Sequence, residues 1–260
     1  SLSEEKFLFL GAGEAAGGIA DLLVEAMMKE GLTQEQAVDR IFLFDSHGLV
    51  TKDREGLTPL KQKFAHEQEP QSTFLDAIGE VKPTAIVGCA AQAGSFNAYV
   101  LSAMARINER PIIFALSNPT SRSECTAREA YTYTEGKCLF ASGSPFPQVE
   151  VNGKTFIPRQ SNNSYVFPGI GLGLVVSSPR IVPQSVFLSA AEALSKIVSE
   201  DDLENGSLFP SLTKIREVSQ SIAAAVAEQC FTAGVAGVPK PDDLSKAIQE
   251  AMYKPVYDRI

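Results

Sequence analysis

The sequence lacks a run of apolar residues long enough to cross a membrane. A membrane-spanning helix needs about 18 to 20 such residues, and the longest stretch here, residues 170–177, is interrupted by Gly171 and Gly173. Basic residues are also few and scattered: 23 Lys and Arg stand against 31 Asp and Glu, and the net charge is −8. Nucleic acids and anionic membranes require a concentrated basic face. We therefore expect neither as a partner and favour small-molecule ligands.

Cysteine and histidine are scarce as well. The cysteines show no CxxC spacing and are too few for a disulfide scaffold, so we expect buried, reduced thiols at Cys89, Cys125, Cys138 and Cys230. The two histidines, His47 and His66, fall in a polar stretch, and we interpret both as exposed loop residues. No Ser-His-Asp or Cys-His arrangement and no metal-ligand spacing is evident. We therefore predict no catalytic and no metal-binding residue in this chain.

The composition is that of a globular protein, with 44% hydrophobic and 21% charged residues. No signal peptide precedes the first expected strand. We expect a cytoplasmic location, with any organellar targeting segment upstream of Ser1.

Apolar strands alternate with helices over the first part of the chain. A strand at residues 7–10, a turn at 11–13, a helix at 15–28 and a second strand at 41–45 form a β-α-β unit. Further strands are expected at 84–88, 111–116 and 138–141, and further helices at 74–81, 98–107 and 126–134. Each strand is almost continuously apolar, which predicts a mostly parallel sheet covered on both faces.

The pattern changes after Pro147. Asn152-Gly153 predicts a hairpin over 149–156, and helices are expected at 185–199, from 211 or 212 to 233, and from 241 or 242 to 252. The middle helix carries an apolar face of Ile215, Val218, Ile222, Ala225 and Val226. We predict one domain over 1–260, with a core at 6–180 and helices at 185–252 that pack on it and toward a missing domain. We also expect an apolar patch or a dimer contact there.

The first turn carries the motif G-x-G-x-x-A, from Gly11 and Gly13 through Glu14 and Ala15 to Ala16. The first glycine allows the turn, the second lets a pyrophosphate approach the backbone, and the small third residue lets the helix pack closely on the strand. The N–H groups at the start of the helix would face the phosphates. The context favours a dinucleotide site in a doubly wound, Rossmann-type α/β fold; a purely structural turn is the alternative.

Asp45 ends the second strand, where a carboxylate would accept hydrogen bonds from a ribose diol. Ser46, Lys61 and Lys63 follow and could serve a 2′-phosphate instead; an ordinary solvated face is the alternative for the lysines.

The carboxyl ends of parallel strands gather at one edge of a sheet, where ligands bind. Residues 88–91, 117–118 and 142–144 should therefore lie near the cofactor, with Cys89, Ala90 and Ser117 among them. Asn118 could bind a substrate carboxylate or a carboxamide, although an asparagine before Pro119 is also an ordinary turn residue.

Five ordered motifs together resemble the cofactor-binding domain of the malic enzymes. They are residues 9–16, 108–111, 116–120, 140–146 and 162–169, and the resemblance extends over nearly the whole chain. It implies oxidative decarboxylation of (S)-malate to pyruvate and CO2, with NAD or NADP and a Mg or Mn ion. The family's lysine base, tyrosine acid and metal ligands belong to upstream segments, so the fragment alone is expected to be inactive. The resemblance also implies a homo-oligomer, a dimer or a tetramer.

By motif position, the resemblance assigns cofactor contacts to Gly11, Gly13, Glu14, Ala15, Ala16, Asp45, Cys89, Ala90 and Ser117. It places Asn118, Asn162 and Asn163 near malate and the nicotinamide. Ser46 and Lys61 resemble the NADP-preferring members, whereas His47 departs from the lysine often found there, and we favour NADP over NAD. Two alternatives remain open: a stand-alone nucleotide-binding or redox-sensing module, and a dehydrogenase for another 2-hydroxy acid.

Overall fold

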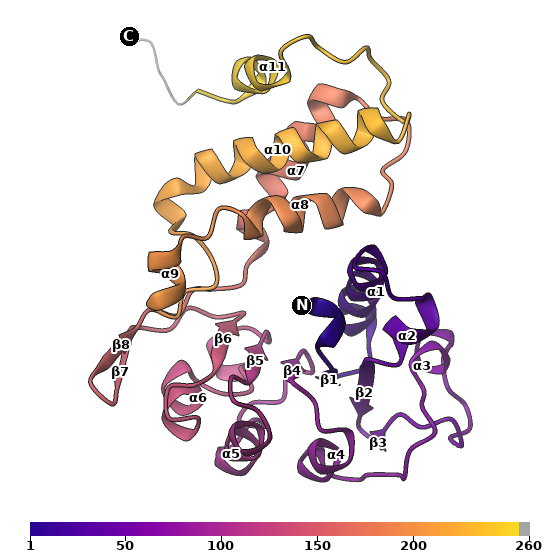
Figure 1. Cartoon of the computed structure of the whole chain (residues 1–260), viewed down its shortest axis with the longest axis vertical. Helices are drawn as coiled ribbons and strands as arrows, with labels where there is room; N and C mark the ends of the chain where they lie inside the picture. The colour runs from indigo at the N-terminus through magenta and orange to yellow at the C-terminus, as the bar shows by residue number, and fades with distance from the viewer. Residues whose placement is uncertain (255–260) are drawn as a thin grey trace. The chain divides into compact units, whose positions relative to one another are not determined.

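The computed structural model describes residues 1–254, which form two compact units (Figure 1). The first comprises Ser1–Ser161 and Glu200–Leu208, and the second comprises Asn162–Ser199 and the chain from Phe209 onward. The expectation of one domain with a core at 6–180 stays a prediction. Residues 255–260, which that expectation includes, lie outside the described residues.

The first unit is built on a six-stranded sheet with the order β3-β2-β1-β4-β5-β6. The strands are β1 (Phe7–Leu10), β2 (Ile41–Asp45), β3 (Gly48–Leu49), β4 (Ala85–Gly88), β5 (Ile112–Ala115) and β6 (Leu139–Ser142). All pairs are parallel except β2–β3, a short antiparallel edge pair that the sequence analysis did not predict. The order reverses between β1 and β4, whose last residues, Leu10 and Gly88, are in register. This confirms the predicted doubly wound, Rossmann-type fold.

Both faces of this sheet are buried, which explains the continuous apolar strands. Leu8 and Leu10 belong to one core cluster, and Phe7 and Phe9 belong to another on the opposite face. Helices α4 (Phe74–Val81), α5 (Ala98–Ile107) and α6 (Ala127–Tyr133) supply residues to the first cluster, and α1 (Glu14–Lys29) and α2 (Gln34–Val38) to the second. Figure 1 shows these two helical layers on either side of the strands.

Local signals in the sequence set several element boundaries. Thr126 and Glu129 form the expected capping box at the start of α6. Asn152 and Gly153, with φ angles of 53° and 74°, form the predicted hairpin turn between β7 (Val149–Val151) and β8 (Lys154–Phe156). The unit also contains η1 (Leu2–Glu4), α3 (Pro59–Lys63), η2 (Thr120–Arg122) and α9 (Glu200–Glu204).

The second unit is helical. Its elements are η3 (Asn163–Tyr165), α7 (Phe167–Ser177), α8 (Ser185–Ser195), η4 (Leu212–Lys214), α10 (Ile215–Thr232) and α11 (Leu244–Ala251). The predicted apolar face of α10 is its packing face, because Val218, Ile222 and Val226 are fully buried. Ile215 and Ala225 are only half-buried.

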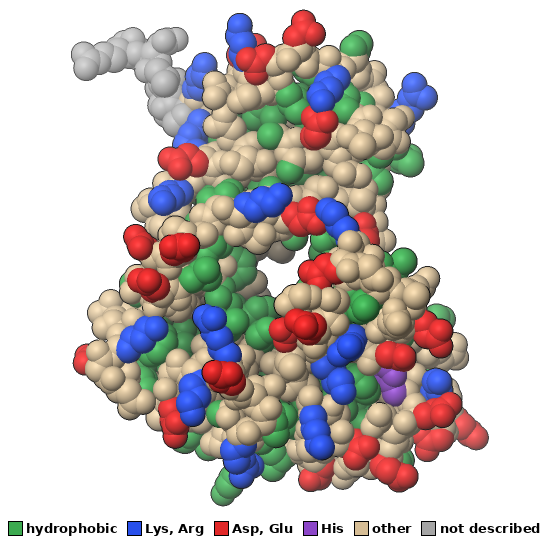
Figure 2. Space-filling view, viewed as in Figure 1, with side chains coloured by type: hydrophobic (Ala, Val, Ile, Leu, Met, Phe, Trp, Pro, Cys, Tyr) green, Lys and Arg blue, Asp and Glu red, His purple; other side chains and the backbone are tan. Residues whose placement is uncertain are grey.

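Charged and apolar side chains are distributed differently on the surface. On the face in Figure 2, Lys and Arg are interspersed with Asp and Glu. Among the described residues, eight of the fourteen exposed large hydrophobic side chains belong to the second, smaller unit, including Phe167, Val175 and Ile181. These three residues precede the helices expected at 185–252, and the apolar patch or dimer contact expected on those helices stays a prediction. No helix within residues 1–254 is long and apolar enough to cross a membrane.

Two glycines of α7 allow its close contact with α10. A Cβ added at Gly169 would lie 2.6 Å from Ile222 Cβ. One added at Gly173 would lie 2.7 Å from the Ala223 carbonyl oxygen and 2.8 Å from Val226 Cβ. A Cβ at Gly171, on the exposed face of the same helix, would meet nothing within 4 Å. The helix backbone and α10 therefore pack directly against each other at the two buried glycines.

We predict opposite stability effects for two alanine substitutions in α7. Gly173→Ala would force the α7 backbone away from Ala223 and Val226 of α10, and overpacking of this kind costs about 1–3 kcal/mol. Gly171→Ala adds only helix propensity, a gain of about 0.5–1 kcal/mol. Urea unfolding monitored by circular dichroism measures both changes. Equal stability of the two variants would contradict the packing described for this helix pair.

Candidate dinucleotide site

The turn after β1 has the backbone geometry that its glycines suggest. Gly11 adopts a φ of +123°, and a Cβ there would lie 3.0 Å from Cys89 Sγ. Gly13 is the N-cap of α1, and a Cβ there would meet nothing within 4 Å, so space is open beside the start of the helix. Ala16 is fully buried in the core cluster against β1. The three positions thus provide a turn, open space at the start of α1 and close helix packing, the features that a dinucleotide-binding turn requires.

A pocket of about 370 Å³ opens at the carboxyl ends of β1, β2 and β4. It lies at the point where the strand order reverses, where doubly wound sheets bind their ligands. Seven residues expected to bind cofactor line it: Gly11, Gly13, Asp45, Ser46, Lys61, Cys89 and Ala90. Glu14 and Ala15 are exposed in the first turn of α1 beside it. The contacts of all these residues with a dinucleotide stay predictions.

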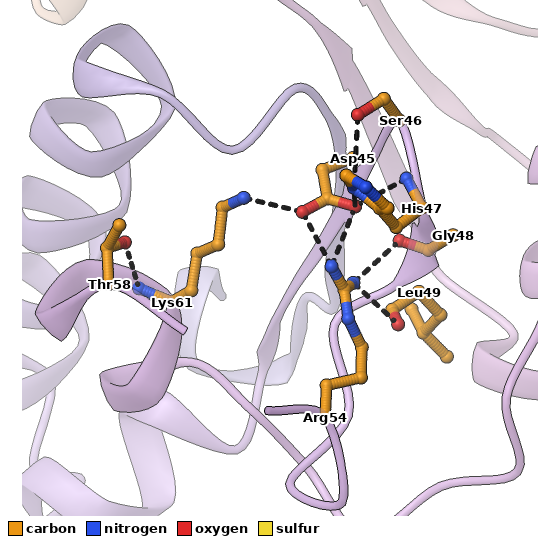
Figure 3. A network of polar contacts seen from close by, with 8 residues as sticks. All are labelled: Asp45, Ser46, His47, Gly48, Leu49, Arg54, Thr58 and Lys61. Carbon is orange, nitrogen blue, oxygen red and sulfur yellow. Dashed lines mark hydrogen bonds and ion pairs between the residues drawn. The ribbon is translucent and has the colours of Figure 1, made fainter. Parts of the chain in front are cut away.

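Asp45 occupies the end of β2, and every side of its carboxylate is engaged (Figure 3). Its Oδ1 accepts from Arg54 Nη2 at 3.1 Å and from the His47 backbone N–H at 2.8 Å. Its Oδ2 accepts from Arg54 Nη2 at 2.9 Å and from Lys61 Nζ at 2.6 Å. A carboxylate has about four acceptor positions, so this side chain has little capacity left for ribose hydroxyls.

The charge of Asp45 is correspondingly well stabilised. The side chain is only 8% exposed. Burial alone would raise the pKa of Asp45, but hydrogen bonds from Arg54, Lys61 and the His47 N–H outweigh it and lower the pKa to about 2. Two cations surround one anion, so the cluster Asp45–Arg54–Lys61 carries a net charge of +1 at neutral pH.

Arg54 is the residue of this cluster that the sequence analysis missed. It also donates from Nη1 to the carbonyl oxygens of Gly48 and Leu49, at 3.3 Å and 3.2 Å. Arg54 lies in a polar loop without a hydrophobic periodicity that would predict its position. The loop folds back onto β2 and brings Arg54 to Asp45. Arg54 therefore fixes both the carboxylate and the turn after β2.

The two lysines considered for a 2′-phosphate have different surroundings. Lys61 belongs to α3, which Thr58 caps, and it lines the pocket. Lys63 Nζ instead pairs with Asp21 Oδ1 at 2.6 Å and is not a lining residue. Only Lys61 therefore presents its charge to the pocket.

One histidine differs from expectation. His47 is exposed, as predicted, but the prediction of an exposed His66 is wrong, because it is 8% exposed. Its Nε2 lies 2.8 Å from the Ile41 carbonyl oxygen, and its ring lies 4.2 Å from that of Phe42. His66 forms a bridge with Thr51, and the N–H of the adjacent Val50 donates to the Leu43 carbonyl oxygen of β2 at 2.9 Å, so the segment lies close to β2 and the ring is buried. Burial lowers the pKa of His66, against the raising effect of the Ile41 hydrogen bond, and the residue packs within the fold.

The loops after β4 and β5 meet at Ser117. The Ala91 N–H donates to Ser117 Oγ at 2.9 Å, and Ser117 N–H and Oγ–H both donate to the carboxylate of Glu124. Cys89, one residue after β4, is partly buried, and burial with the nearby Glu124 raises the pKa of its thiol to about 11. Its sulfur therefore stays protonated at neutral pH. The other three cysteines are buried and free, as expected.

The predicted substrate asparagines lie in different units. Asn118 follows Ser117 in the first unit and is exposed. Asn162 and Asn163 begin the second unit, where Asn162 Oδ1 accepts from the Ser164 N–H at 2.9 Å and caps η3. Their roles toward substrate stay predictions. Within the described part of the chain, no group of three or more His, Cys, Asp or Glu is placed to hold a metal ion.

Acid should remove the contribution of Asp45 to stability. Its pKa in the folded chain lies below the ordinary 3.8, so its contribution is complete above about pH 4 and is lost as the pH falls toward about 2. Asp45→Asn should therefore be less stable than wild type at neutral pH, and the difference should vanish in acid. Urea unfolding across this range measures it, with the exposed Asp53→Asn as control. A difference that persists unchanged at about pH 2 would contradict the assignment.

Comparison with known proteins identifies the family. The family model for "Malic enzyme, NAD binding domain" matches residues 1–231. The chain is 46% identical over 260 residues to the mitochondrial NAD-dependent malic enzyme of Ascaris suum, covering 100% of this chain and 40% of the relative. It is 48% identical over 261 residues to the NADP-dependent malic enzyme of Homo sapiens, covering 100% of this chain and 46% of the relative. The chain thus spans less than half the length of these curated relatives.

Solved structures agree on the fold. The structure of Entamoeba histolytica malic enzyme superposes with a TM-score of 0.73 at 24% identity, covering 96% of this chain and 49% of that chain. The structure of malic enzyme from Pyrococcus horikoshii gives a TM-score of 0.72 at 23% identity. With the family match over most of the sequence, the chain belongs to the family of malic enzyme NAD-binding domains.

Proposed function

We propose that this chain is the dinucleotide-binding part of an enzyme that converts (S)-malate and NAD(P)+ into pyruvate, CO2 and NAD(P)H. The observation that carries the proposal is the pocket at the switch point of the sheet, where the Gly11–Gly13 turn, the Asp45 cluster and the β4 loop converge. The names of the relatives support the reaction, since they are NAD- or NADP-dependent malic enzymes.

The Asp45 cluster favours NADP over NAD. A carboxylate that binds an NAD ribose must have free acceptor positions, and those of Asp45 are filled by Arg54, Lys61 and the His47 N–H. The net positive charge and the pocket-facing Lys61 suit a 2′-phosphate, which an unpaired aspartate would repel. Ser46 lines the same pocket and offers a further hydroxyl.

The proposed roles of the chain are binding and orientation. The dinucleotide supplies the hydride acceptor, and a Mg or Mn ion held by other parts of the enzyme acts as Lewis acid in decarboxylation. Residues around Gly13 bind the pyrophosphate, and Asn118, Asn162 and Asn163 orient malate or the nicotinamide. We propose that the chain alone is inactive, and that the whole enzyme is a cytoplasmic homo-oligomer.

Gly13→Ala should strongly weaken dinucleotide binding without loss of stability. The added methyl group meets no protein atom within 4 Å, so it projects into the space proposed for the pyrophosphate. We expect the affinity for NADP to fall by about 100-fold or more, the scale of one lost close phosphate contact. Gly18→Ala, in the same helix and equally open, is the matched control and should bind as wild type does. Calorimetric titration measures the affinities, and unfolding curves measure the stability of both variants. Normal binding by Gly13→Ala would overturn the assignment of the pyrophosphate site.

Lys61→Gln should reduce the preference for NADP. Loss of the ammonium removes a charge-assisted contact to the 2′-phosphate, so the NADP affinity should fall about tenfold or more while NAD binding changes little. Lys63→Gln changes the same charge two residues away, outside the pocket, and should leave the ratio of the two affinities unchanged. A parallel loss in both variants would indicate a general electrostatic effect and contradict a specific role for Lys61.

A further inference from the structure

Glu124 carries a carboxylate that is completely buried beside the proposed site, with 0% exposure. It follows η2 and lies against the end of β4, where Gly88 leaves room for it: a Cβ at Gly88 would lie 2.9 Å from Glu124 Oε1. Its backbone is fastened to the loop after β4, because its carbonyl oxygen accepts from the Phe96 N–H at 3.0 Å. The neighbouring Ser123 carbonyl accepts from the Gly94 N–H at 3.2 Å. Glu124 thus connects the two loops that follow β4 and β5.

Ser117 donates two hydrogen bonds to this carboxylate. Glu124 Oε2 accepts from the Ser117 N–H at 3.2 Å, and Oε1 accepts from the Ser117 hydroxyl. With its proton directed to Glu124, the hydroxyl presents a lone pair to the Ala91 N–H, 2.9 Å away. The buried acceptor therefore determines that Ser117 Oγ acts as an acceptor for Ala91.

Ala91 needs such support because its backbone is in the left-handed region, with a φ of 53°. This conformation is unfavourable for alanine and persists only where surrounding contacts hold it. Cys89 and Ala90, which precede it, and Gln92, which follows it, all line the dinucleotide pocket. The conformation of Ala91 thus sets the shape of one pocket wall.

We propose that Glu124 is a positioning residue for the dinucleotide site: through Ser117, its buried carboxylate holds residues 89–92 in the conformation that receives the ligand. The ligand itself rests on the proposed function. Glu124 does not line the pocket, so its effect is indirect, and the proposed route to the pocket runs through Ser117 and Ala91.

The first test compares dinucleotide affinities by calorimetry. Glu124→Gln keeps the volume but replaces one acceptor oxygen with a donor NH2, and we expect the dissociation constants for NADP and NAD to rise by a similar factor, about tenfold. Adding Ala91→Gly should restore most of the affinity, because glycine adopts a positive φ without support. Val81→Ala is the control for a general loss of stability. Val81 is buried in α4 and does not line the pocket, so this variant should leave the dinucleotide affinities unchanged. Unchanged affinity in a folded Glu124→Gln, or no restoration by Ala91→Gly, would overturn the proposal.

The second test needs no ligand. Amide hydrogen exchange of Ala91, measured by NMR in the free chain, should accelerate by about tenfold or more in Glu124→Gln and in Ser117→Ala, since both remove support for its hydrogen bond. Ser117→Ala removes only a hydroxyl, and it provides the test if the Glu124 variant does not fold. If the wild-type chain binds neither dinucleotide, the proposed function fails. The amide exchange rate of Ala91 then tests the positioning role of Glu124 by itself. An unchanged Ala91 rate in both variants overturns it.

Discussion

The ion pairs that Asp45 forms with Arg54 and Lys61 set the charge at the end of β2, beside the pocket. Parallel pairing of β1 and β2 places Asp45 beside the glycine turn, and the loop after β3 returns Arg54 and Lys61 to it. Without these partners, a buried aspartate at this place would be unfavourable and would repel a phosphate. With them, the cluster carries one net positive charge beside the glycine turn proposed to bind the pyrophosphate.

Small residues at the strand ends extend this arrangement across the sheet. Gly11 permits the close approach of Cys89, and Gly88 makes room for the buried carboxylate of Glu124. A Cβ at Gly143, just after β6, would clash with the Leu116 carbonyl oxygen. The loops after β1, β4, β5 and β6 therefore pack closely against one another. The loops after β1 and β4 line the pocket, and the loops after β5 and β6 support them from outside it.

Elements with short-range signals were predictable from the sequence. The apolar strands, the capping box at Thr126 and the Asn152-Gly153 hairpin all depend on neighbouring residues, and each is present. Arg54 and the burial of His66 were not predictable, because both depend on how the long loop after β2 folds back. The contact of Glu124 with Ser117 was not predictable either. The two residues are seven positions apart, and the turn through η2 brings them together.

The most direct measurement titrates the wild-type chain with adenosine 2′,5′-bisphosphate and, separately, with adenosine 5′-monophosphate. The two probes differ only in the 2′-phosphate, so their affinity ratio isolates the contribution of that phosphate, which the Asp45–Arg54–Lys61 cluster is proposed to receive. We expect the bisphosphate to bind about tenfold or more tightly, with a ratio that falls as salt is added. Equal binding, or tighter binding of the monophosphate, would contradict the account.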